Sequence, residues 1–299
     1  MSDVIRTFDL TKHFRGTLAL NSLNLEIPEG AVYALVGPNG AGKTTALKVL
    51  MNIHRPSSGR AEILGTDSRR LAPRDFARIG YVSENQDLPE WMTVAQFLDY
   101  LRPFYPTWDD ERCAELLVQL DLPRHHKLKH LSRGMRMKAA LASSLAYRPK
   151  IILLDEPFSG LDALMRDELV ESLLAGAGEA TVLISSHDLS EIESFASHVG
   201  YLDQGHLYFS EELTTLTARF REVEVTLDAV PARRGDCPAS WLRLESAASV
   251  VRFVESRFDT ERTPAEVRRV FGQVAGVAFT PMPLRAIFVA LAKSARRAA

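Results

Sequence analysis

Residues 37–45 combine glycine, lysine and threonine at a spacing that could bind the phosphates of a nucleotide. The stretch is Gly37-Pro38-Asn39-Gly40-Ala41-Gly42-Lys43-Thr44-Thr45, which matches the pattern G-x-x-x-x-G-K-[ST] at every fixed position. Its glycines allow backbone N–H groups to turn inward, so a polyphosphate would be bound largely by the main chain. We expect Lys43 to reach the β- and γ-phosphates, Thr44 to place its hydroxyl on Mg²⁺, and Thr45 to lie near the α-phosphate. The stretch predicts a nucleotide site, and the alternative is a glycine-rich turn without a ligand.

The segments on either side of this loop agree with a phosphate site. Residues 32–36 are a short apolar run typical of a buried strand, and residues 46–51 continue as a helix. A helix N-terminus carries a partial positive charge, which favours a bound anion. Strand, loop and helix therefore follow one another in the order that such a site requires.

Two adjacent carboxylates form the second candidate group. Asp155 and Glu156 follow the apolar run 151–154, and a strand that ends there would place them at the sheet edge where the phosphate loop opens. We expect Asp155 to hold Mg²⁺ directly or through water, and Glu156 to polarise the attacking water as a general base. The alternative for both is an acidic helix cap after a strand.

Two aromatic side chains complete the candidate site. His187 follows the run 181–185 and could hold the γ-phosphate and the attacking water in register, although a lone histidine more often has a structural role. Phe14 lies ahead of the phosphate loop and could stack on an adenine ring. Its alternative is an aromatic of the strand core.

The composition restricts the classes of protein that remain. The chain has 299 residues, 46% of them hydrophobic, with 36 Lys and Arg against 38 Asp and Glu and a formal net charge of -2. No overall basic charge favours direct nucleic-acid binding. Cys113 and Cys237 are far apart in the sequence, which favours inert thiols in a reducing cytoplasm. No run approaches the roughly 18 apolar residues of a membrane span, and the N-terminus lacks a signal-peptide pattern.

The order of apolar patterns predicts an α/β fold. An antiparallel opening covers residues 4–36, with Leu23, Leu25 and Ile27 alternating in one strand. Parallel-sheet signals follow, interrupted at about 87–147 by a helical lobe with three helices separated by prolines. We expect a mixed sheet core with an antiparallel β subdomain in a first domain of residues 1–218, and a small α+β C-terminal domain in residues 219–299.

Several motifs together resemble the ATP-binding subunit of an ABC transporter over about residues 2–215. Residues 130–135, His-Leu-Ser-Arg-Gly-Met, are similar to the LSGGQ signature, and residues 151–157 resemble the Walker B strand. Residues 159–162 match the D-loop, and residues 185–188 match the switch histidine. The resemblance implies a P-loop NTPase of the ABC type that binds ATP.

The resemblance also implies roles for single residues. It places Phe14 at the position of the adenine-stacking aromatic and Asp162 in the D-loop of the nucleotide site. Ser132 and Gly134 open a helix whose N-terminus would contact the γ-phosphate held by the opposite subunit. This implies a head-to-tail dimer with two ATP molecules at its interface, formed with a second copy or with a related ATPase.

Two departures from the family pattern stand out. The signature has Arg133 in place of the first glycine and Met135 in place of glutamine, which resembles the signatures of bacterial ABC-2 type exporters. The Q-loop usually has glutamine where Glu84 stands. An acid there could bind Mg²⁺ or orient water, and the alternative is a surface acid at a hinge of the lobe.

The lobe is where the family meets a membrane partner. Trp91 and Met92 follow the Q-loop, and we expect them to be exposed beside a groove that receives a short helix of that partner. The alternative is that Trp91 packs inside the lobe. His126 and His130 have a metal-like spacing, but the lysines between them favour a solvated basic turn.

The resemblance and the residues together predict an ATPase that drives a separately encoded multi-span permease, with export favoured over import. The chain would then lie in the cytoplasm, peripheral on the inner face of the cell membrane. One alternative is a soluble ABC-type ATPase that acts on the ribosome or in DNA repair; another is a kinase with the same loop. The C-terminal domain, with an apolar helical face at Leu284, Ile287, Phe288 and Leu291, could bind a regulator, support the dimer or only extend the packing.

Overall fold

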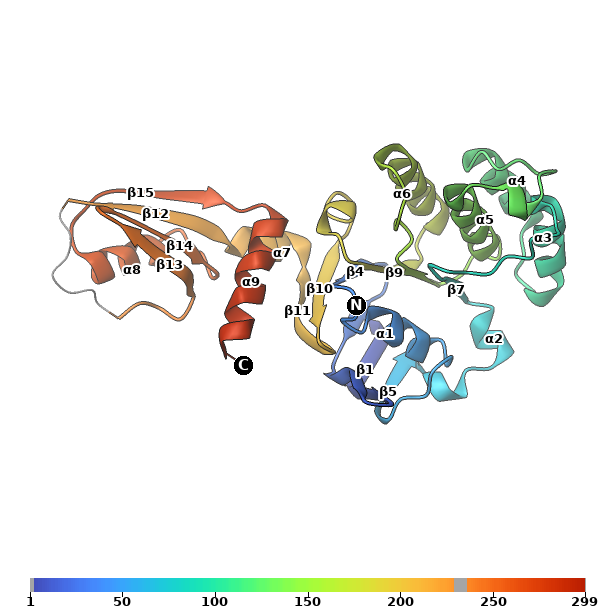
Figure 1. Ribbon diagram of the computed structural model, residues 1–299, viewed down its shortest axis with the longest axis horizontal. Helices are drawn as coiled ribbons and strands as arrows, with labels where there is room; N and C mark the ends of the chain where they lie inside the picture. The colour runs from blue at the N-terminus through green and yellow to red at the C-terminus, as the bar shows by residue number, and fades with distance from the viewer. Residues whose placement is uncertain (1–2, 229–235, 299) are drawn as a thin grey trace. The chain divides into compact units, whose positions relative to one another are not determined.

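The computed structural model describes residues 3–228 and 236–298 of the chain (Figure 1). The chain forms two compact units, Met1–Ser210 and Glu211–Ala299, each of which is described separately. The two compact units divide after Ser210, eight residues before the expected domain boundary at residue 218, which stays a prediction.

A six-stranded sheet forms the centre of the first unit. Its strands have the order β11-β10-β4-β9-β8-β7. They are β4 (Val32–Val36), β7 (Ile79–Val82), β8 (Ile151–Asp155), β9 (Thr181–Ser186), β10 (His198–Asp203) and β11 (His206–Glu212). All neighbouring pairs from β10 to β7 are parallel, so the carboxyl ends of these five strands lie at one edge of the sheet.

Alternating side chains bury both faces of this sheet. On β8, Ile152 and Leu154 pack against the helical lobe and the helix that follows β8, whereas Ile151 and Leu153 belong to the core on the other face. Successive side chains of a strand point to opposite faces, and a parallel sheet is covered on both, which explains the continuous apolar runs in the sequence.

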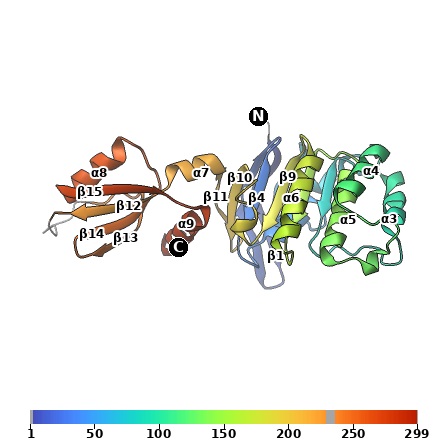
Figure 2. The same ribbon diagram turned by 90° about the horizontal axis from the view of Figure 1, so that it is seen from above.

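The other face is covered by α1 (Lys43–Leu50) and an antiparallel sheet. That sheet contains β1 (Asp3–Phe14), β2 (Thr17–Leu23), β3 (Glu26–Pro28), β5 (Ser58–Ile63) and β6 (Thr66–Asp67). Figure 2 shows the ribbon turned by 90°, with β1 of this sheet labelled. Because Leu47, Val49 and Leu50 of α1 are all buried, the helix that follows the phosphate loop is fixed between two sheets.

The expectation of one strand through Leu23, Leu25 and Ile27 was wrong, although all three side chains are buried. Strand β2 ends at Leu23 and β3 begins at Glu26. Ser22 has a positive φ of 47°, and the Asn24 side chain accepts a hydrogen bond from the Asp9 backbone N–H. This local turn chemistry interrupts the strand.

The helical lobe contains α3 (Val94–Leu101), α4 (Asp110–Gln119) and α5 (Arg133–Leu145), and α6 (Ala163–Ala177) follows β8. The short α2 (Pro73–Phe76) precedes β7. Each of the four longer helices begins after a side-chain cap, supplied by Thr93, Asp109, Ser132 and Asp162 in turn. These caps satisfy backbone N–H groups that have no partner within the helix, and they set where each helix starts.

The second unit is a small α+β domain. It contains α7 (Leu213–Arg219), β12 (Arg221–Leu227), β13 (Trp241–Ala247), β14 (Val250–Glu255), α8 (Arg262–Phe271), β15 (Val274–Pro281) and α9 (Leu284–Ala298). Its antiparallel sheet has the order β13-β14-β12-β15. Trp241 stacks on Phe253 with ring centroids 4.0 Å apart, and Phe271 of α8 lies 5.7 Å from the same ring.

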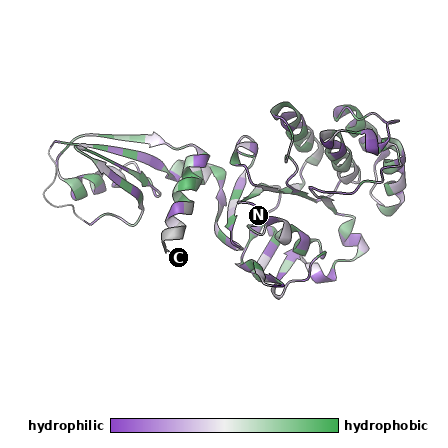
Figure 3. Ribbon diagram, in the orientation of Figure 1, coloured by the Kyte–Doolittle hydropathy of each residue, from purple (hydrophilic) through white to green (hydrophobic). Residues whose placement is uncertain are grey.

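Helix α9 has the apolar face that the sequence predicts. Leu284, Ile287 and Phe288 are buried and Leu291 is half-buried, and hydrophobic and hydrophilic bands alternate along the helix (Figure 3). Of all the helices in the described parts of the chain, none has both the length and the apolar character needed to cross a bilayer.

Candidate functional site

The parallel register of the central sheet brings the candidate residues together. Val36 of β4 pairs with Ser186 of β9, and Ser185 pairs with Asp155 of β8. The phosphate loop, the two carboxylates and His187 therefore leave the sheet at the same edge, as expected for ligand sites of open α/β sheets.

At two positions of the phosphate loop, a side chain would collide with the backbone of a neighbouring segment, so only glycine fits. Gly42 has φ 110°, and a Cβ there would lie 2.3 Å from the Ala19 carbonyl oxygen. A Cβ on Gly37 would lie 1.9 Å from the Leu202 carbonyl oxygen. Gly40 has φ 82° but open space around it. The loop is thus shaped by neighbouring backbone as well as by its own turn.

The other loop residues differ in their exposure to solvent. Pro38 and Asn39 are exposed, Ala41 is buried, and its N–H donates to the Pro38 carbonyl oxygen at 3.1 Å. Thr44 and Thr45 are half-buried in the first turn of α1.

Lys43 is a buried cation with three oxygen partners. Its Nζ donates to the carbonyl oxygens of Gly37 at 2.7 Å and Pro38 at 3.2 Å. The same atom lies 3.1 Å from Oε1 of Glu156, and both side chains are more than nine-tenths buried. A buried ion pair of this kind is stable only when further hydrogen bonds satisfy the charges, which the two carbonyl groups do for Lys43.

Hydroxyl groups hold the first carboxylate. Oδ1 of Asp155 accepts hydrogen bonds from Thr44 at 2.9 Å and from Ser185 at 2.7 Å, and the residue is 2% exposed. Ser185 also accepts from the Glu156 N–H at 3.0 Å. Ser185 was not among the predicted site residues, and the only signal in the sequence is a hydroxyl residue at a strand end beside the switch histidine.

Glu156 is fixed between two basic side chains. Its Oε1 pairs with Lys43, and its Oε2 lies 2.7 Å from Nδ1 of His187. The His187 backbone N–H also donates to Oε2 at 3.3 Å. Glu156 has φ 50°, a backbone conformation that is strained for a residue with a Cβ and that recurs at functional sites.

The pKa of His187 is raised above its usual value of 6.5, chiefly by the hydrogen bond to Glu156. Partial burial opposes this shift, the charges of Glu156 and Glu191 add to it, and Lys43 opposes it. The protonated imidazole is therefore the form that this contact favours.

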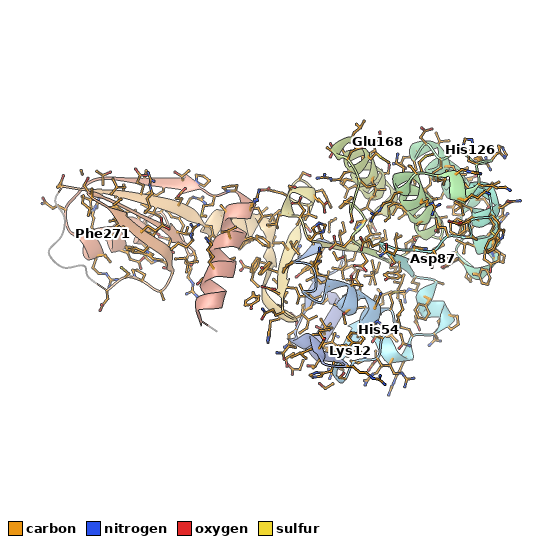
Figure 4. All side chains as sticks on the ribbon, in the orientation of Figure 1. Lys12, His54, Asp87, His126, Glu168 and Phe271 are labelled. Carbon is orange, nitrogen blue, oxygen red and sulfur yellow. The ribbon has the colours of Figure 1, made fainter. Side chains whose placement is uncertain are left out.

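Phe14 lies at the end of β1, and the residue is 41% exposed. His54 meets it edge-on at 5.3 Å between centroids, and Lys12 Nζ lies 4.9 Å from its centroid. Figure 4 shows Lys12 and His54 together beside the antiparallel sheet. The ring is accessible to a planar group and is not part of the strand core.

Ser132, Gly134 and Asp162 lie at the starts of α5 and α6. Ser132 Oγ accepts from the Met135 N–H at 3.2 Å, and Asp162 Oδ1 accepts from the Met165 N–H at 2.9 Å. A Cβ on Gly134 would lie 1.9 Å from Cε of Met165, so the two helix starts are in close contact. Within the described parts of the chain, none of these three residues forms a hydrogen bond or ion pair with the phosphate loop.

Glu84 leaves the same sheet edge after β7 but is engaged elsewhere. Its Oε1 lies 3.3 Å from the guanidinium of Arg133. Gln86 accepts a hydrogen bond from the Ser83 N–H at 3.4 Å. Sequence reasoning noted Glu84 and Arg133 as separate departures and missed that they are partners.

Comparison with known proteins identifies the family. A family model described as "ABC transporter" matches residues 20–159. The chain is 32% identical over 227 residues to the bacitracin transport ATP-binding protein BcrA of Enterococcus faecalis, which covers 74% of this chain and 73% of that protein. It belongs to the ABC transporter ATP-binding proteins.

Two further relatives agree with this assignment. The lantibiotic transport ATP-binding protein SrtF of Streptococcus pyogenes is 32% identical over 212 residues, covering 70% of this chain and 91% of that protein. A solved dimeric ATP-binding cassette in a post-hydrolysis state with ADP and Pi has a TM-score of 0.62 and 26% identity, covering 70% of this chain and 98% of that one. The predicted fold class and the predicted resemblance to transporter ATPases are confirmed, and the chain is an ATPase subunit of this family.

The lobe of this ATP-binding protein exposes part of the predicted partner surface. Trp91 is 72% exposed and does not pack inside the lobe, whereas Met92 is half-buried against the lobe core. His126 and His130 are exposed. Cys237 is exposed, and burial raises the pKa of the half-buried Cys113 thiol to about 11.

Replacing Gly42 with alanine should destabilise the protein more than the same change at Gly40. Both glycines have positive φ, so both substitutions introduce backbone strain of about 1–2 kcal/mol. Only Gly42→Ala also forces a Cβ against the Ala19 carbonyl. We expect the free energy of unfolding, measured with urea, to be lower for Gly42→Ala than for Gly40→Ala by about 1 kcal/mol or more. Equal losses would contradict the close approach.

The His187 contact should be visible as a pH dependence. Because the folded pKa is raised, the contact stabilises the protein fully below pH 6.5 and its contribution is lost as the pH rises through the raised pKa. We expect NMR titration of the imidazole to give a pKa above 6.5, and Glu156→Gln to move that pKa downward. An unchanged His187 pKa in Glu156→Gln would contradict the assignment of its cause.

Proposed function

We propose that this chain couples ATP binding and hydrolysis to the movement of a substrate through a separately encoded membrane permease. The observation that carries the chemistry is the Glu156 carboxylate held between Lys43 and His187 at the edge of the parallel sheet. In this proposal Glu156 is the general base that polarises the attacking water, and His187 keeps the water and the γ-phosphate in register.

Lys43 has a second role that follows from its partners. Its ammonium now pairs with Glu156, and the β- and γ-phosphates of ATP would compete for the same cation. Binding of ATP would thus draw Lys43 toward phosphate and leave one oxygen of Glu156 available to water. Phe14 stacks on the adenine, and backbone N–H groups of residues 37–45 cradle the phosphates.

The residues at the sheet edge fit Mg²⁺. Thr44 Oγ1 and Asp155 Oδ1 lie 2.9 Å apart, and hydroxyl and carboxylate oxygens are donors that this hard cation prefers. When bound, Mg²⁺ would supply positive charge at the β- and γ-phosphates. Glu84 as a further ligand stays a prediction, since its carboxylate pairs with Arg133.

A dimer would complete the site. The first turn of α5, with Ser132 as its cap and Gly134 beside Met165, offers backbone N–H groups to the γ-phosphate bound by the opposite subunit. Asp162 of the D-loop lies at the adjacent helix start. We propose a head-to-tail dimer, with a second copy or a related ATPase, that closes on two ATP molecules and reopens after hydrolysis.

The proposed partner is a multi-span permease, and the proposed location is the cytoplasmic face of the membrane. The named relatives include ATP-binding proteins of bacitracin and lantibiotic transport, which supports transport of a substrate; export is the direction that we propose. The relatives reported above are transport subunits, so they give no support to a role on the ribosome.

A groove beside the lobe could receive this partner. It has a volume of about 380 Å³ and lies near the loop that follows β7, with Phe76, Tyr81, Leu88, Phe97, Tyr105 and Tyr147 among its lining residues. An amphipathic helix places apolar side chains into a groove of this kind. Trp91, exposed in the loop before α3, would extend the contact.

Glu156→Gln should abolish hydrolysis without abolishing ATP binding. The amide cannot accept the proton from water, so we expect the rate of phosphate release to fall by about a hundredfold or more. ATP affinity should be at least that of the unsubstituted chain, because the competitor for Lys43 is gone, and a closed dimer should accumulate. Lys43 keeps two carbonyl partners, so the fold is retained.

The control for this experiment is Glu168→Gln. Glu168 of α6 pairs with Lys138 of α5 and has no contact with the phosphate loop among the described residues (Figure 4). The Glu168→Gln variant should therefore hydrolyse ATP at the normal rate. Normal hydrolysis by Glu156→Gln, with phosphate measured under saturating ATP and Mg²⁺, would rule out Glu156 as the base.

Trp91→Ala should weaken the association with the permease. We expect a multi-span membrane protein to co-elute at equal stoichiometry when the chain is purified from detergent-solubilised native membranes, and less of it to co-elute with Trp91→Ala. An exposed interface tryptophan contributes about 2 kcal/mol or more when it is central to a contact.

Val118→Ala is the matched control, because Val118 is 82% exposed on α4 and lies outside the groove. Unchanged co-elution of the membrane chain with Trp91→Ala would remove Trp91 from the interface. Co-elution of ribosomal proteins with no membrane chain would overturn the transport proposal.

A further inference from the structure

Two residues that depart from the family pattern are partners in one ion pair. Glu84 stands at the Q-loop position and Arg133 in the signature, and Oε1 of Glu84 lies 3.3 Å from the Arg133 guanidinium. The two residues are 49 positions apart in the sequence and both line a cleft of about 420 Å³. Their pairing connects the loop after β7 to the first turn of α5.

Arg133 occupies a position where a cation is unfavourable by itself. It is the first residue of α5, and the N-terminus of a helix carries a partial positive charge. The first turn of α5 contains no acidic residue. The carboxylate of Glu84 therefore supplies the negative charge that this helix start lacks.

Arg133 also contacts a third loop. A Cβ on Gly160 would lie 2.9 Å from a terminal nitrogen of the guanidinium, so Arg133 packs against the turn that precedes α6. Gly160 has φ 73°, which makes the turn a position for glycine. The guanidinium thus lies between Glu84 and the D-loop.

The sheet register places the start of the loop that carries Glu84 beside the end of β8. Val82 of β7 pairs with Leu154 of β8, the residue before Asp155. Neighbouring strands lie about 4.8 Å apart, so Glu84 leaves the sheet beside the strand that ends at Asp155. An unpaired carboxylate there would repel the phosphates of ATP.

We infer that Arg133 is a positioning residue for Glu84: it holds the carboxylate on the first turn of α5 and neutralises it, so that an acid at this position does not weaken ATP binding. The inference rests on the proposed ATP site. The pair is partly exposed, with 53% of the Arg133 side chain and 34% of the Glu84 side chain accessible, so its contribution to overall stability is small. Its effect is instead on the charge at the nucleotide site.

The test is a double-mutant cycle on the full chain, with affinity for AMP-PNP and Mg²⁺ measured by calorimetry. Arg133→Ala leaves Glu84 unpaired, and we expect the dissociation constant to rise by about two- to fivefold, the range of exposed ion pairs. In the Glu84→Gln background the same change should have no effect, because no charge remains to be neutralised. Arg133→Lys keeps the charge and should stay within about twofold of the unsubstituted chain.

Two further readouts separate positioning from a general structural role. The effect of Arg133→Ala should shrink as salt rises from about 0.05 M to 0.5 M, because exposed charges are screened over a few ångströms at high ionic strength. In ATP hydrolysis, the substitution should raise KM and leave kcat within about twofold, since only ground-state binding is changed.

The pair Arg136 and Glu90 provides a matched control. Arg136 lies in the first turn of α5, as Arg133 does, and its guanidinium is 3.4 Å from the carboxylate of Glu90. Glu90 follows Glu84 in the segment between β7 and α3, but it does not line the cleft. Arg136→Ala and Glu90→Gln should leave the dissociation constant for AMP-PNP unchanged, singly and together. A loss equal to that of Arg133→Ala would show a general disturbance of α5 and overturn the inference.

The outcomes distinguish this inference from the proposed function. If the unsubstituted chain binds no AMP-PNP, the proposed nucleotide site is wrong and the inference falls with it. If the chain binds AMP-PNP normally but Arg133→Ala weakens binding equally with and without Glu84→Gln, only the inference is wrong. No effect of Arg133→Ala in either background also overturns it.

Discussion

The parallel register of β4, β9 and β8 is the constraint on which the site depends. It places the ends of three strands at one edge, so residues far apart in the sequence meet there without any long loop. Lys43 and Glu156 are more than a hundred positions apart, yet their charged atoms lie 3.1 Å apart. A slip of one residue in any of these strands would turn the site residues to the opposite face.

Burial makes the contacts at this edge depend on one another. Asp155 and Glu156 are almost inaccessible, and each is held by groups from a neighbouring strand or loop. An ion pair in such surroundings requires full hydrogen bonding, and for Lys43 the carbonyl oxygens of Gly37 and Pro38 supply part of it. The helix starts at Ser132 and Asp162 have a different basis, because their caps are local and can form from the sequence around them.

These two kinds of constraint explain what sequence reasoning could predict. The strand β4 has the bounds expected from its apolar run, and the loop at residues 37–45 follows β4 as the motif requires. The break between Leu23 and Glu26 was missed because it depends on the Asn24 side chain bonding across to Asp9. Elements of the second unit such as α8 contain no motif. The burial of their apolar residues depends on the sheet against which they pack, so it could not be predicted from the local sequence. The roles of the site residues remain predictions.

The carboxylates at the sheet edge lie beside the site proposed for the phosphates of ATP, and like charges repel each other. Each carboxylate has a partner that offsets its charge. Hydroxyl groups donate to Asp155, Lys43 and His187 contact Glu156, and Arg133 pairs with Glu84. In the last pair, Glu84 and Arg133, both residues differ from the family pattern described above. A lone acid at residue 84 would oppose ATP binding, and a lone cation at residue 133 would oppose the helix dipole. In this proposal each of the two charges offsets the unfavourable effect of the other, so the Glu84 carboxylate and the Arg133 guanidinium act as one unit.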